Sequence, residues 1–184
     1  MKDKKEIILP AITLGIICLI STLLLSCTDS VTRGQIAVIQ KQNADKARMK
    51  VCSGAAAFEP VETGDTSSEL YEALDSSGQC IGYAVSTKDK SYGGDISVMT
   101  GLDTDGRITG VEILEIDDTP GLGMNAKKEA FRNQYTGKSA DSVTVSKNAS
   151  GDEIQAITGA TRTSEAVTRC VKKAYQIVSE KGGL

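Results

Sequence analysis

The stretch DISVMTGLDTDGRITGVEILEI, residues 95–116, carries the clearest structural signal in the sequence. Two runs rich in β-branched residues flank Asp105 and Gly106, and an Asp-Gly pair in that setting is a strong signal for a tight hairpin turn. Alternating apolar and polar residues predict another strand at residues 80–88, and SVTVSK predicts a short one at residues 142–147. Hairpins of this kind predict a mostly antiparallel sheet.

Helical patterns lie between and after these strands. Apolar residues recur at helical spacing in residues 164–181, and a shorter helical run at residues 125–135 stops at Gly137. SSELYEAL, residues 67–74, predicts a short helix with Ser67 as its N-cap. This order of strands and helices predicts an α+β domain, in which helices pack against a mostly antiparallel sheet.

Residues 7–28 form an uncharged and largely apolar run that follows three lysines. A helix of this length is about 33 Å long and spans a bilayer core of about 30 Å. The run is longer than the apolar core of a signal peptide, which has about 7–15 residues. We therefore expect one transmembrane helix, and the lysines favour a cytoplasmic N-terminus with the remainder facing outward. Cleavage with lipidation at Cys27 and simple secretion are the alternatives.

The predicted organisation has three parts. Residues 1–28 are expected to form the cytoplasmic N-terminus and the transmembrane anchor. Residues 29–66 are expected to form a juxtamembrane helix, continuous with the anchor or kinked at Gly34, and then a linker rich in Gly, Ser and Thr from residue 53. Residues 67–184 are expected to form the extracytoplasmic domain.

Composition excludes several functional classes. A net charge of −3, only 4% aromatic residues and no tryptophan argue against nucleic-acid binding. The chain has no histidine, which removes the commonest general base and the commonest zinc ligand. The five cysteines lack C-x-x-C spacing, so no metal centre is expected, whereas Cys52 and Cys80 could form a disulfide or remain buried thiols. Any redox chemistry would have to come from a cofactor.

AITGATRTSEAV, residues 156–167, places four hydroxyl side chains at the start of the last predicted helix. One N-cap needs one hydroxyl, and we assign that role to Thr163 or Ser164. A helix N-terminus also has free N–H groups and binds phosphate, and the small Gly-Ala pair here would let a phosphate approach the backbone, with added charge from Arg162. The stretch therefore predicts either a capped helix alone or a site for a phosphate-bearing ligand.

GLGMNA, residues 121–126, fits the dinucleotide-binding pattern G-x-G-x-x-A. A Rossmann unit needs a parallel βαβ crossover, whereas the strand predicted before this stretch is the second half of a hairpin and Pro120 rigidifies the turn. Two interpretations remain open. One is a tight turn capped by Asn125, and the other is a loop in which Gly121 and Gly123 let the main chain lie against a flat ligand.

Three motifs, taken in order, resemble the FMN-binding domains of Rnf complexes and of sodium-pumping NADH:quinone reductases. ITGAT at residues 157–161 resembles the family's S/T-G-A-T flavinylation motif, and DTPGLG at residues 118–123 resembles its E-T-P-G-L-G loop. YGGDISVMTGLD at residues 92–103 is similar to its Y-G-G strand, and residues 71–85 are similar to its first hairpin region. The resemblance covers essentially the whole chain, and the chain length favours the compact Rnf form.

The resemblance implies that FMN is attached by a phosphoester bond to Thr161, the last threonine of the motif. The residues that it places around the phosphate are Thr158, Gly159 and Ala160. The residues that it places against the isoalloxazine ring are Thr119, Leu122 and Gly123, and two further cofactor-binding candidates are Lys147 and Tyr92. The chain departs from the family at Gln155 and Ala156, where an acidic residue and a glycine are usual, and this position bears on recognition by the flavin transferase.

By resemblance, the protein is an electron-transfer subunit of a membrane-bound ferredoxin:NAD oxidoreductase complex that translocates sodium ions or protons. It would relay electrons through covalent FMN without a catalytic site of its own. The expected partners are the other membrane and redox subunits, the membrane, and the flavin transferase. The alternatives are the equivalent FMN subunit of a sodium-pumping NADH:quinone reductase and a membrane-anchored assembly module without flavin.

Overall fold

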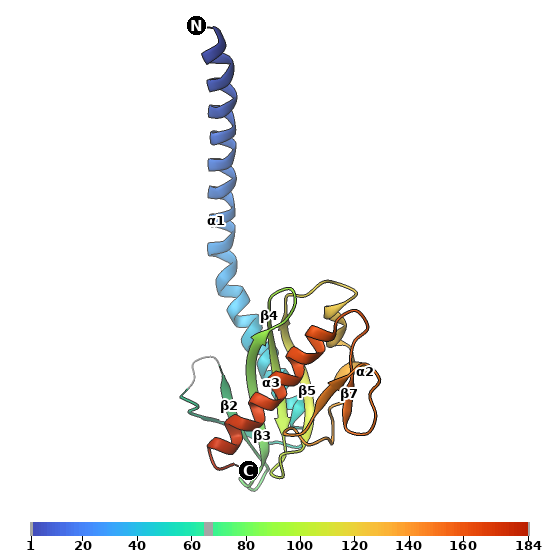
Figure 1. Cartoon of the computed structure of the whole chain (residues 1–184). Coiled ribbons are helices and arrows are strands. Elements are labelled where there is room, and N and C mark those ends of the chain that lie inside the picture. The colour runs from blue at the N-terminus through green and yellow to red at the C-terminus, as the bar shows by residue number, and fades with distance from the viewer. Residues whose placement is uncertain (1, 65–67, 184) are drawn as a thin grey trace. The chain divides into compact units, whose positions relative to one another are not determined.

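The computed structural model describes residues 2–64 and 68–183 (Figure 1). By its internal contacts the chain divides into two units, Met1–Gln42 and Asn43–Leu184. The helices are α1 (Lys2–Val51), the 3₁₀ helix η1 (Gly123–Lys127), α2 (Glu129–Arg132) and α3 (Thr161–Glu180). The strands are β1 (Ala57–Val61), β2 (Glu69–Leu74), β3 (Cys80–Lys90), β4 (Asp95–Leu102), β5 (Ile108–Ile116), β6 (Thr144–Ser146) and β7 (Glu153–Gln155).

The apolar run near the N-terminus lies within α1, as predicted. α1 continues through Gly34 without a break, and from Ile8 onward it is long enough and apolar enough to cross a membrane. Thr13 and Thr22 donate their hydroxyls to carbonyl oxygens one turn earlier in the helix, at 2.9 and 2.8 Å. These bonds satisfy the hydroxyls within the helix itself, which suits an apolar environment.

Five strands form one antiparallel sheet in the order β1-β2-β3-β4-β5, so each strand pairs with its neighbour in the sequence. The predicted hairpin is confirmed as β4 and β5. At its turn Gly106 has a φ of +75°, which favours glycine, and its N–H donates to the carbonyl of Asp103 at 3.1 Å. The fold is therefore α+β with an antiparallel sheet, as the patterning predicts.

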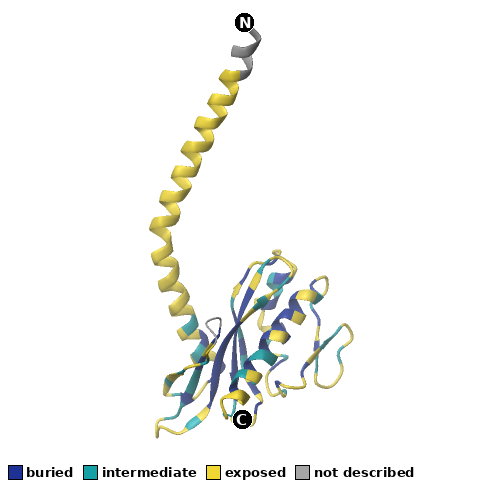
Figure 2. Ribbon diagram, turned by 60° about the vertical axis from the view of Figure 1, so that its left-hand side comes forward, coloured by how far each residue is buried: buried dark blue, intermediate teal, exposed yellow. Residues whose placement is uncertain are grey.

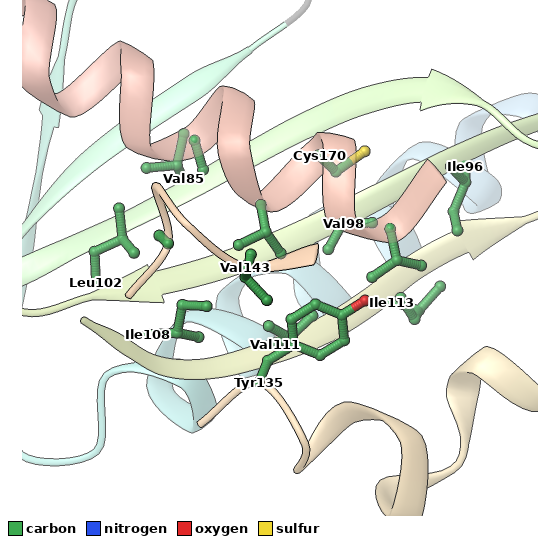
Figure 3. Close-up of a cluster of buried hydrophobic side chains, with 14 of the residues drawn as sticks. Val85, Ile96, Val98, Leu102, Ile108, Val111, Ile113, Tyr135, Val143 and Cys170 are labelled. Atoms are coloured by element: carbon green, nitrogen blue, oxygen red, sulfur yellow. The ribbon is translucent and has the colours of Figure 1, made fainter. Parts of the chain in front are cut away.

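α3 lies across one face of the sheet and forms the main core with it (Figure 3). Its buried stripe, which includes Cys170 and Val171, packs against strand residues such as Val85 and Val98. The Thr87 hydroxyl donates to the carbonyl of Cys170 at 3.1 Å, which fixes the helix along the strands. Figure 2 shows the same stripe as the buried side of a helix whose outer side is exposed.

The end of α1 covers part of the opposite face of the sheet. Ala47, Val51 and Cys52 form a second buried cluster with side chains of β2, β3 and β4, which are Ala73, Ala84 and Met99. Gly101 permits this close approach, because a Cβ atom there would lie 2.4 Å from the carbonyl oxygen of Val51. The same carbonyl accepts a hydrogen bond of 2.5 Å from Thr109, so the C-terminal end of α1 is attached to β5.

Of the helix predicted at residues 67–74, the described part, residues 68–74, is not helical. Glu69–Leu74 forms β2, which pairs with β1 on one side and β3 on the other. The spacing of Leu70 and Ala73, both buried, resembles one face of a helix, but pairing on two sides outweighs that local preference. The proposed cap, Ser67, lies outside the described residues. Part of the predicted linker, Ala57–Val61, also differs from prediction, because it forms the edge strand β1.

The predicted helix at residues 125–135 is broken into η1 and α2. Lys128 separates them in an extended conformation, with φ −71° and ψ 138°. Gly137 follows at φ +80°, but its N–H donates to the carbonyl of Ile108 at 2.7 Å rather than closing a long helix. The predicted strand at residues 142–147 is confirmed as β6, and its parallel partner β7 was not predicted.

The five cysteines are free thiols, so no disulfide joins Cys52 and Cys80, and of these two only Cys52 is a buried thiol, whereas Cys80 is half-buried. Cys52 is buried and donates to the carbonyl of Tyr83 at 3.4 Å. Burial raises the pKa of Cys52, and likewise that of Cys170, to about 11. Neither thiol is therefore ionised near neutral pH, and both behave as small apolar residues of the core.

Candidate functional site

A pocket of about 770 Å³ lies beside the N-terminus of α3. Four separate segments line it: the loop before β4, the loop after β5, the end of β6, and the connection from β7 into α3. All nine residues that are predicted from the sequence to bind the cofactor are among its lining residues. They are Tyr92, Thr119, Leu122, Gly123, Lys147, Thr158, Gly159, Ala160 and Thr161.

The turn before α3 is built around Gly159. Its φ is +78°, and a Cβ atom there would lie 3.1 Å from a methyl carbon of Leu122. The N–H of Ala160 donates to the carbonyl of Ile157 at 2.9 Å, which closes the turn. Glycine is therefore needed here for its conformation and for its contact with the loop after β5.

α3 begins at Thr161, three residues before the predicted start. Its first intrahelical bond joins the N–H of Ser164 to the carbonyl of Ala160 at 3.1 Å. The N–H groups of Thr161, Arg162 and Thr163 come before that bond, so they are the ones that a helix N-terminus offers to an anion. The N-terminus of the helix thus faces the same pocket that these residues line.

The predicted capping role of Thr163 or Ser164 is wrong. The N-cap residue is Ala160, and it makes no side-chain capping bond. The Ser164 hydroxyl donates back to the carbonyl of Ala160 at 3.2 Å and accepts from the N–H of Ile157 at 3.0 Å. Both side chains lie inside the first turn of the helix. Their hydroxyls bond to Asp118, Ile157 and Ala160, and neither acts as the N-cap.

Asp118 is the pocket residue that sequence reasoning missed. It is 6% exposed, and its carboxylate accepts hydrogen bonds from the Thr163 hydroxyl at 2.7 Å, from the Gly93 N–H at 2.5 Å, and from the Ser91 hydroxyl. Burial alone raises the pKa of Asp118, but these bonds outweigh burial and hold the pKa below its usual value. The carboxylate is therefore ionised at neutral pH.

Glycines of two motifs pack directly on this aspartate. A Cβ atom at Gly123 would lie 2.5 Å from the Cβ of Asp118, and one at Gly93 would lie 2.3 Å from the carbonyl oxygen of Asp117. A larger residue at Gly93 would force the loop before β4 away from the loop after β5, and one at Gly123 would displace Asp118 within its own segment. These glycines therefore allow close contact within the protein as well as approach to a ligand.

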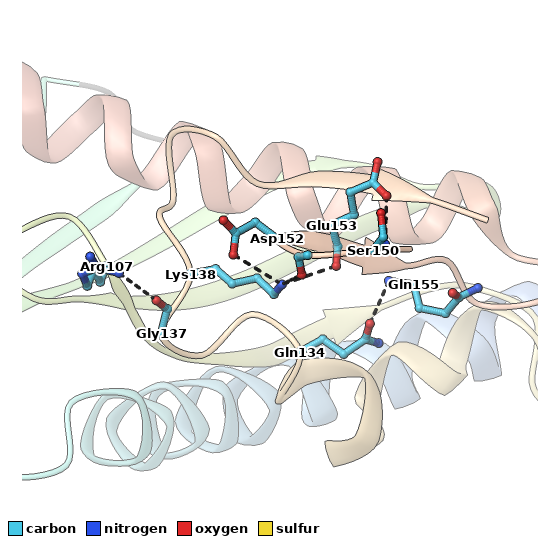
Figure 4. Close-up of polar contacts among 9 residues, drawn as sticks. Arg107, Gln134, Gly137, Lys138, Ser150, Asp152, Glu153 and Gln155 are labelled. Atoms are coloured by element: carbon cyan, nitrogen blue, oxygen red, sulfur yellow. Dashed lines mark hydrogen bonds and ion pairs between the residues drawn. The ribbon is translucent and has the colours of Figure 1, made fainter. Parts of the chain in front are cut away.

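Lys147 lines the pocket and belongs to a loop that polar contacts hold in place. Figure 4 shows the contacts made by Gln134 and Lys138. The Gln155 side chain donates to the carbonyl of Lys147 at 2.6 Å and accepts from the N–H of Ala149 at 3.1 Å. The backbone N–H of Gln155 donates to the Gln134 side chain at 2.7 Å, and Lys138 donates to the carbonyl of Gly151 at 2.8 Å. Both ends of the loop are thus fixed.

The charged side chains of the pocket are arranged by depth. Lys147 and Arg162 lie at its rim, whereas Asp118 is buried. Thr161 is half-buried, and Thr163 is only 1% exposed. A phosphate at the rim would meet two cations and the N-terminus of α3.

Comparison with known proteins agrees with this geometry. The family described as FMN-binding domain matches residues 91–176, a range that contains all three motifs. The C subunit of the Na⁺-translocating NADH-quinone reductase from Parabacteroides distasonis has the same fold, with a TM-score of 0.60 over 77% of this chain and 92% of that chain. The two sequences are 18% identical, so the likeness concerns the fold. Fold and site together define the class of FMN-binding domains.

Full-length relatives identify the family within that class. The G subunit of the proton-translocating ferredoxin:NAD⁺ oxidoreductase complex of Clostridium ljungdahlii is 36% identical, over 99% of this chain and 98% of that protein. The G subunit of the Na⁺-translocating complex of Acetobacterium woodii is 36% identical, over 95% and 93%. The chain belongs to the family of G subunits of Rnf-type ion-translocating ferredoxin:NAD⁺ oxidoreductase complexes. Among the alternatives, full-length similarity thus favours the Rnf protein.

Proposed function

We propose that the pocket beside α3 binds FMN and that the chain relays electrons within a membrane-bound ferredoxin:NAD⁺ oxidoreductase complex. One observation carries the proposal. Nine residues from four segments of the chain, all predicted from the sequence to bind the cofactor, line a single pocket. The match to the FMN-binding domain family and the names of the full-length relatives support it. The other subunits of the complex are then its partners.

The pocket suits FMN at both ends of that molecule. A volume of about 770 Å³ lies within the range of small-molecule sites, about 300–1,000 Å³. Leu122 and Ile157 offer apolar surface to a flat ring, and the buried Gly123 lets the ring approach the backbone. Lys147, Arg162 and the N-terminus of α3 offer positive charge to a phosphate.

The chain itself contributes binding and orientation, and FMN when bound supplies the one- and two-electron chemistry. Asp118 accepts three hydrogen bonds and stays ionised, so it holds the site in shape rather than exchanging protons. Leu122 is 45% exposed at the pocket, where it shields a bound ring from water. These roles are those of an electron relay and need no general base.

We further propose that FMN is attached covalently to Thr161. Thr161 is favoured over Thr163 as the attachment site because it is more exposed, whereas the Thr163 hydroxyl is buried and bonded to Asp118. Attachment joins Thr161 Oγ1 to the flavin phosphate, with loss of the hydroxyl proton. A phosphoanhydride bond of a flavin dinucleotide breaks in the same step and a nucleoside monophosphate leaves. A flavin transferase would catalyse this step.

α1 supports a single-pass arrangement in the cell membrane. Residues 1–28 would form the cytoplasmic N-terminus and the anchor, and the apolar part of the helix would serve as the anchor. Residues 29–66 would lead from the membrane, and the FMN-binding domain, residues 67–184, would lie outside the cytoplasm. The two full-length relatives are named for different ions, so the coupling ion here is either protons or sodium.

Co-expression with a flavin transferase tests the function. The full-length protein is expected to fluoresce as a flavin on a denaturing gel, and peptide mass spectrometry is expected to map the modification to Thr161. Thr161→Ala should abolish the fluorescence, whereas Thr163→Ala should retain the modification at Thr161. An unmodified wild-type protein would favour the flavin-free assembly module. A modified peptide that maps to Thr163 would overturn the attachment site alone.

A further inference from the structure

We infer that Asp118 is a positioning residue, which clamps three separate segments into the shape of the FMN site. The three segments are the loop before β4, the loop after β5, and the first turn of α3. The effect of the clamp on the flavin rests on the proposed function. The clamp itself is a property of the protein chain and is testable without flavin.

The hydrogen bonds of Asp118 come from residues far away in the sequence. Ser91 and Gly93 precede it by 27 and 25 residues, and Thr163 follows it by 45. One carboxylate oxygen accepts the Ser91 and Thr163 hydroxyls, and the other accepts the Gly93 N–H. A single buried side chain therefore joins the walls of the pocket that are furthest apart in sequence.

The chemistry of the clamp requires a carboxylate. An ionised carboxylate only accepts hydrogen bonds, and it has enough lone pairs for three donors. An asparagine would present one oxygen and one NH₂ group, and the NH₂ group would oppose one of these donors. The Gly93 N–H and the two hydroxyls could then not all keep this side chain as an acceptor, and a buried donor left without an acceptor is costly.

Packing makes the clamp sensitive to small changes. Gly123 lies so close that a Cβ atom there would be 2.6 Å from a carboxylate oxygen of Asp118. The side chain is 6% exposed, so water has little access to replace a lost bond. The carboxylate of Asp118 thus joins the two loops and the first turn of α3.

The position of the clamp links it to both ends of the proposed ligand. Thr119, next to Asp118, lines the pocket on the side of the flavin ring. Thr163 stands two residues after Thr161, the proposed attachment site. Releasing Asp118 would therefore loosen the ring wall and the attachment end relative to each other, and water would reach the flavin more easily.

The first test measures amide hydrogen exchange at Gly93 in the full-length, flavin-free protein in detergent. Asp118→Ala should accelerate exchange at this amide about tenfold or more, because the Gly93 N–H loses its acceptor. The control is Asp117→Ala, which makes the same change one residue away, at an exposed side chain. Equal exchange at Gly93 in both variants would overturn the clamp.

The second test separates positioning from general destabilisation. Iodide quenching of flavin fluorescence is compared in wild type, Asp118→Asn and Val178→Ala. Val178→Ala is the control, because it creates a cavity at a fully buried residue near the other end of α3. The clamp predicts stronger quenching only in Asp118→Asn. If Val178→Ala increases quenching equally, Asp118 has a structural role alone.

A double variant covers the case in which Asp118→Asn does not fold. Ser91→Ala with Thr163→Val keeps the carboxylate and removes two of its donors. It should also increase iodide quenching, whereas quenching equal to wild type would overturn the proposal. If even the wild-type protein carries no flavin, the proposed function fails, and the Gly93 exchange experiment still decides whether the clamp exists.

Discussion

At the scale of single residues, burial assigns different roles to chemically similar side chains. Thr161 is half-buried in the pocket, whereas Thr163, two residues further along α3, is buried against Asp118. Hydroxyl chemistry is the same in both, so accessibility decides which one can meet a ligand. Lys147 is likewise positioned by Gln155, whose side-chain amide donates a hydrogen bond to the carbonyl of Lys147.

The stability of the domain should depend on pH through Asp118. Its pKa in the folded state is lowered, so its stabilising effect is complete above the unfolded pKa of about 3.9 and is lost as pH falls through the lower, folded value. In urea unfolding from about pH 6 down to pH 3, the free-energy difference between wild type and Asp118→Asn should therefore shrink. A difference that stays constant over this range would contradict the prediction.

Substitutions of Gln155 should act on the loop after β6. Gln155→Ala removes the acceptor of the Ala149 N–H, so amide exchange at Ala149 should accelerate. Gln155→Glu keeps an acceptor for Ala149 but loses the donor to Lys147, so exchange at Ala149 should stay near the wild-type rate. Exchange measured by NMR distinguishes the two, and equal acceleration in both variants would contradict this account.

At the scale of elements, the sheet carries a helix on each face by different means. α3 uses a long stripe of apolar side chains, as its helical pattern predicts. The end of α1 uses close backbone contact instead, because Gly101 and Gly110 form a cross-strand pair directly beneath Val51. The first kind of packing tolerates small changes in volume better than the second.

Adding a methyl group beneath α1 should therefore destabilise the domain in a graded way. A Cβ atom at Gly101 would lie 2.4 Å from the carbonyl oxygen of Val51, whereas one at Gly110 would lie 3.0 Å from its Cα. We expect Gly101→Ala to lower the free energy of unfolding by about 1–3 kcal/mol and Gly110→Ala to lower it less. Urea unfolding followed by circular dichroism measures both, and the reverse order would contradict the packing argument.

At the scale of the whole molecule, the apolar helix and the pocket belong to different units of the chain. Met1–Gln42 supplies a helix of membrane-spanning length, and Asn43–Leu184 contains every residue that lines the pocket. The family to which the chain belongs consists of subunits of membrane complexes, so both units have a place in the proposed relay. In the proposed arrangement, the anchor would restrict the flavin to one membrane surface, where its redox partners would be.

The orientation of the anchor can be tested with thiol labelling. Ser150→Cys introduces a thiol in an exposed loop of the folded unit, and Lys4→Cys introduces one before the apolar run. A membrane-impermeant maleimide added to intact protoplasts should label Ser150→Cys above the wild-type background and leave Lys4→Cys unlabelled until the cells are lysed. Labelling of Lys4→Cys alone in intact protoplasts would invert the proposed topology.

The sequence by itself determined the features that depend on neighbouring residues. Alternation and the Asp-Gly turn determined the hairpin of β4 and β5, and the apolar run determined the membrane-spanning length of α1. Helical spacing located α3 to within three residues. The motifs indicated eight of the nine predicted cofactor-binding residues, because each motif retains its spacing whatever the remainder of the chain does, and all nine line one pocket.

Only the tertiary structure decided the features that depend on distant residues. Residues 69–74 form a strand because two other strands flank them, and Glu153–Gln155 forms one because it pairs with β6. Thr163 is not a helix cap because α3 begins two residues before it, and its hydroxyl instead donates to Asp118, 45 residues earlier. Local patterns express backbone preferences worth about 1 kcal/mol or less per residue, and a buried contact between distant segments is strong enough to outweigh them.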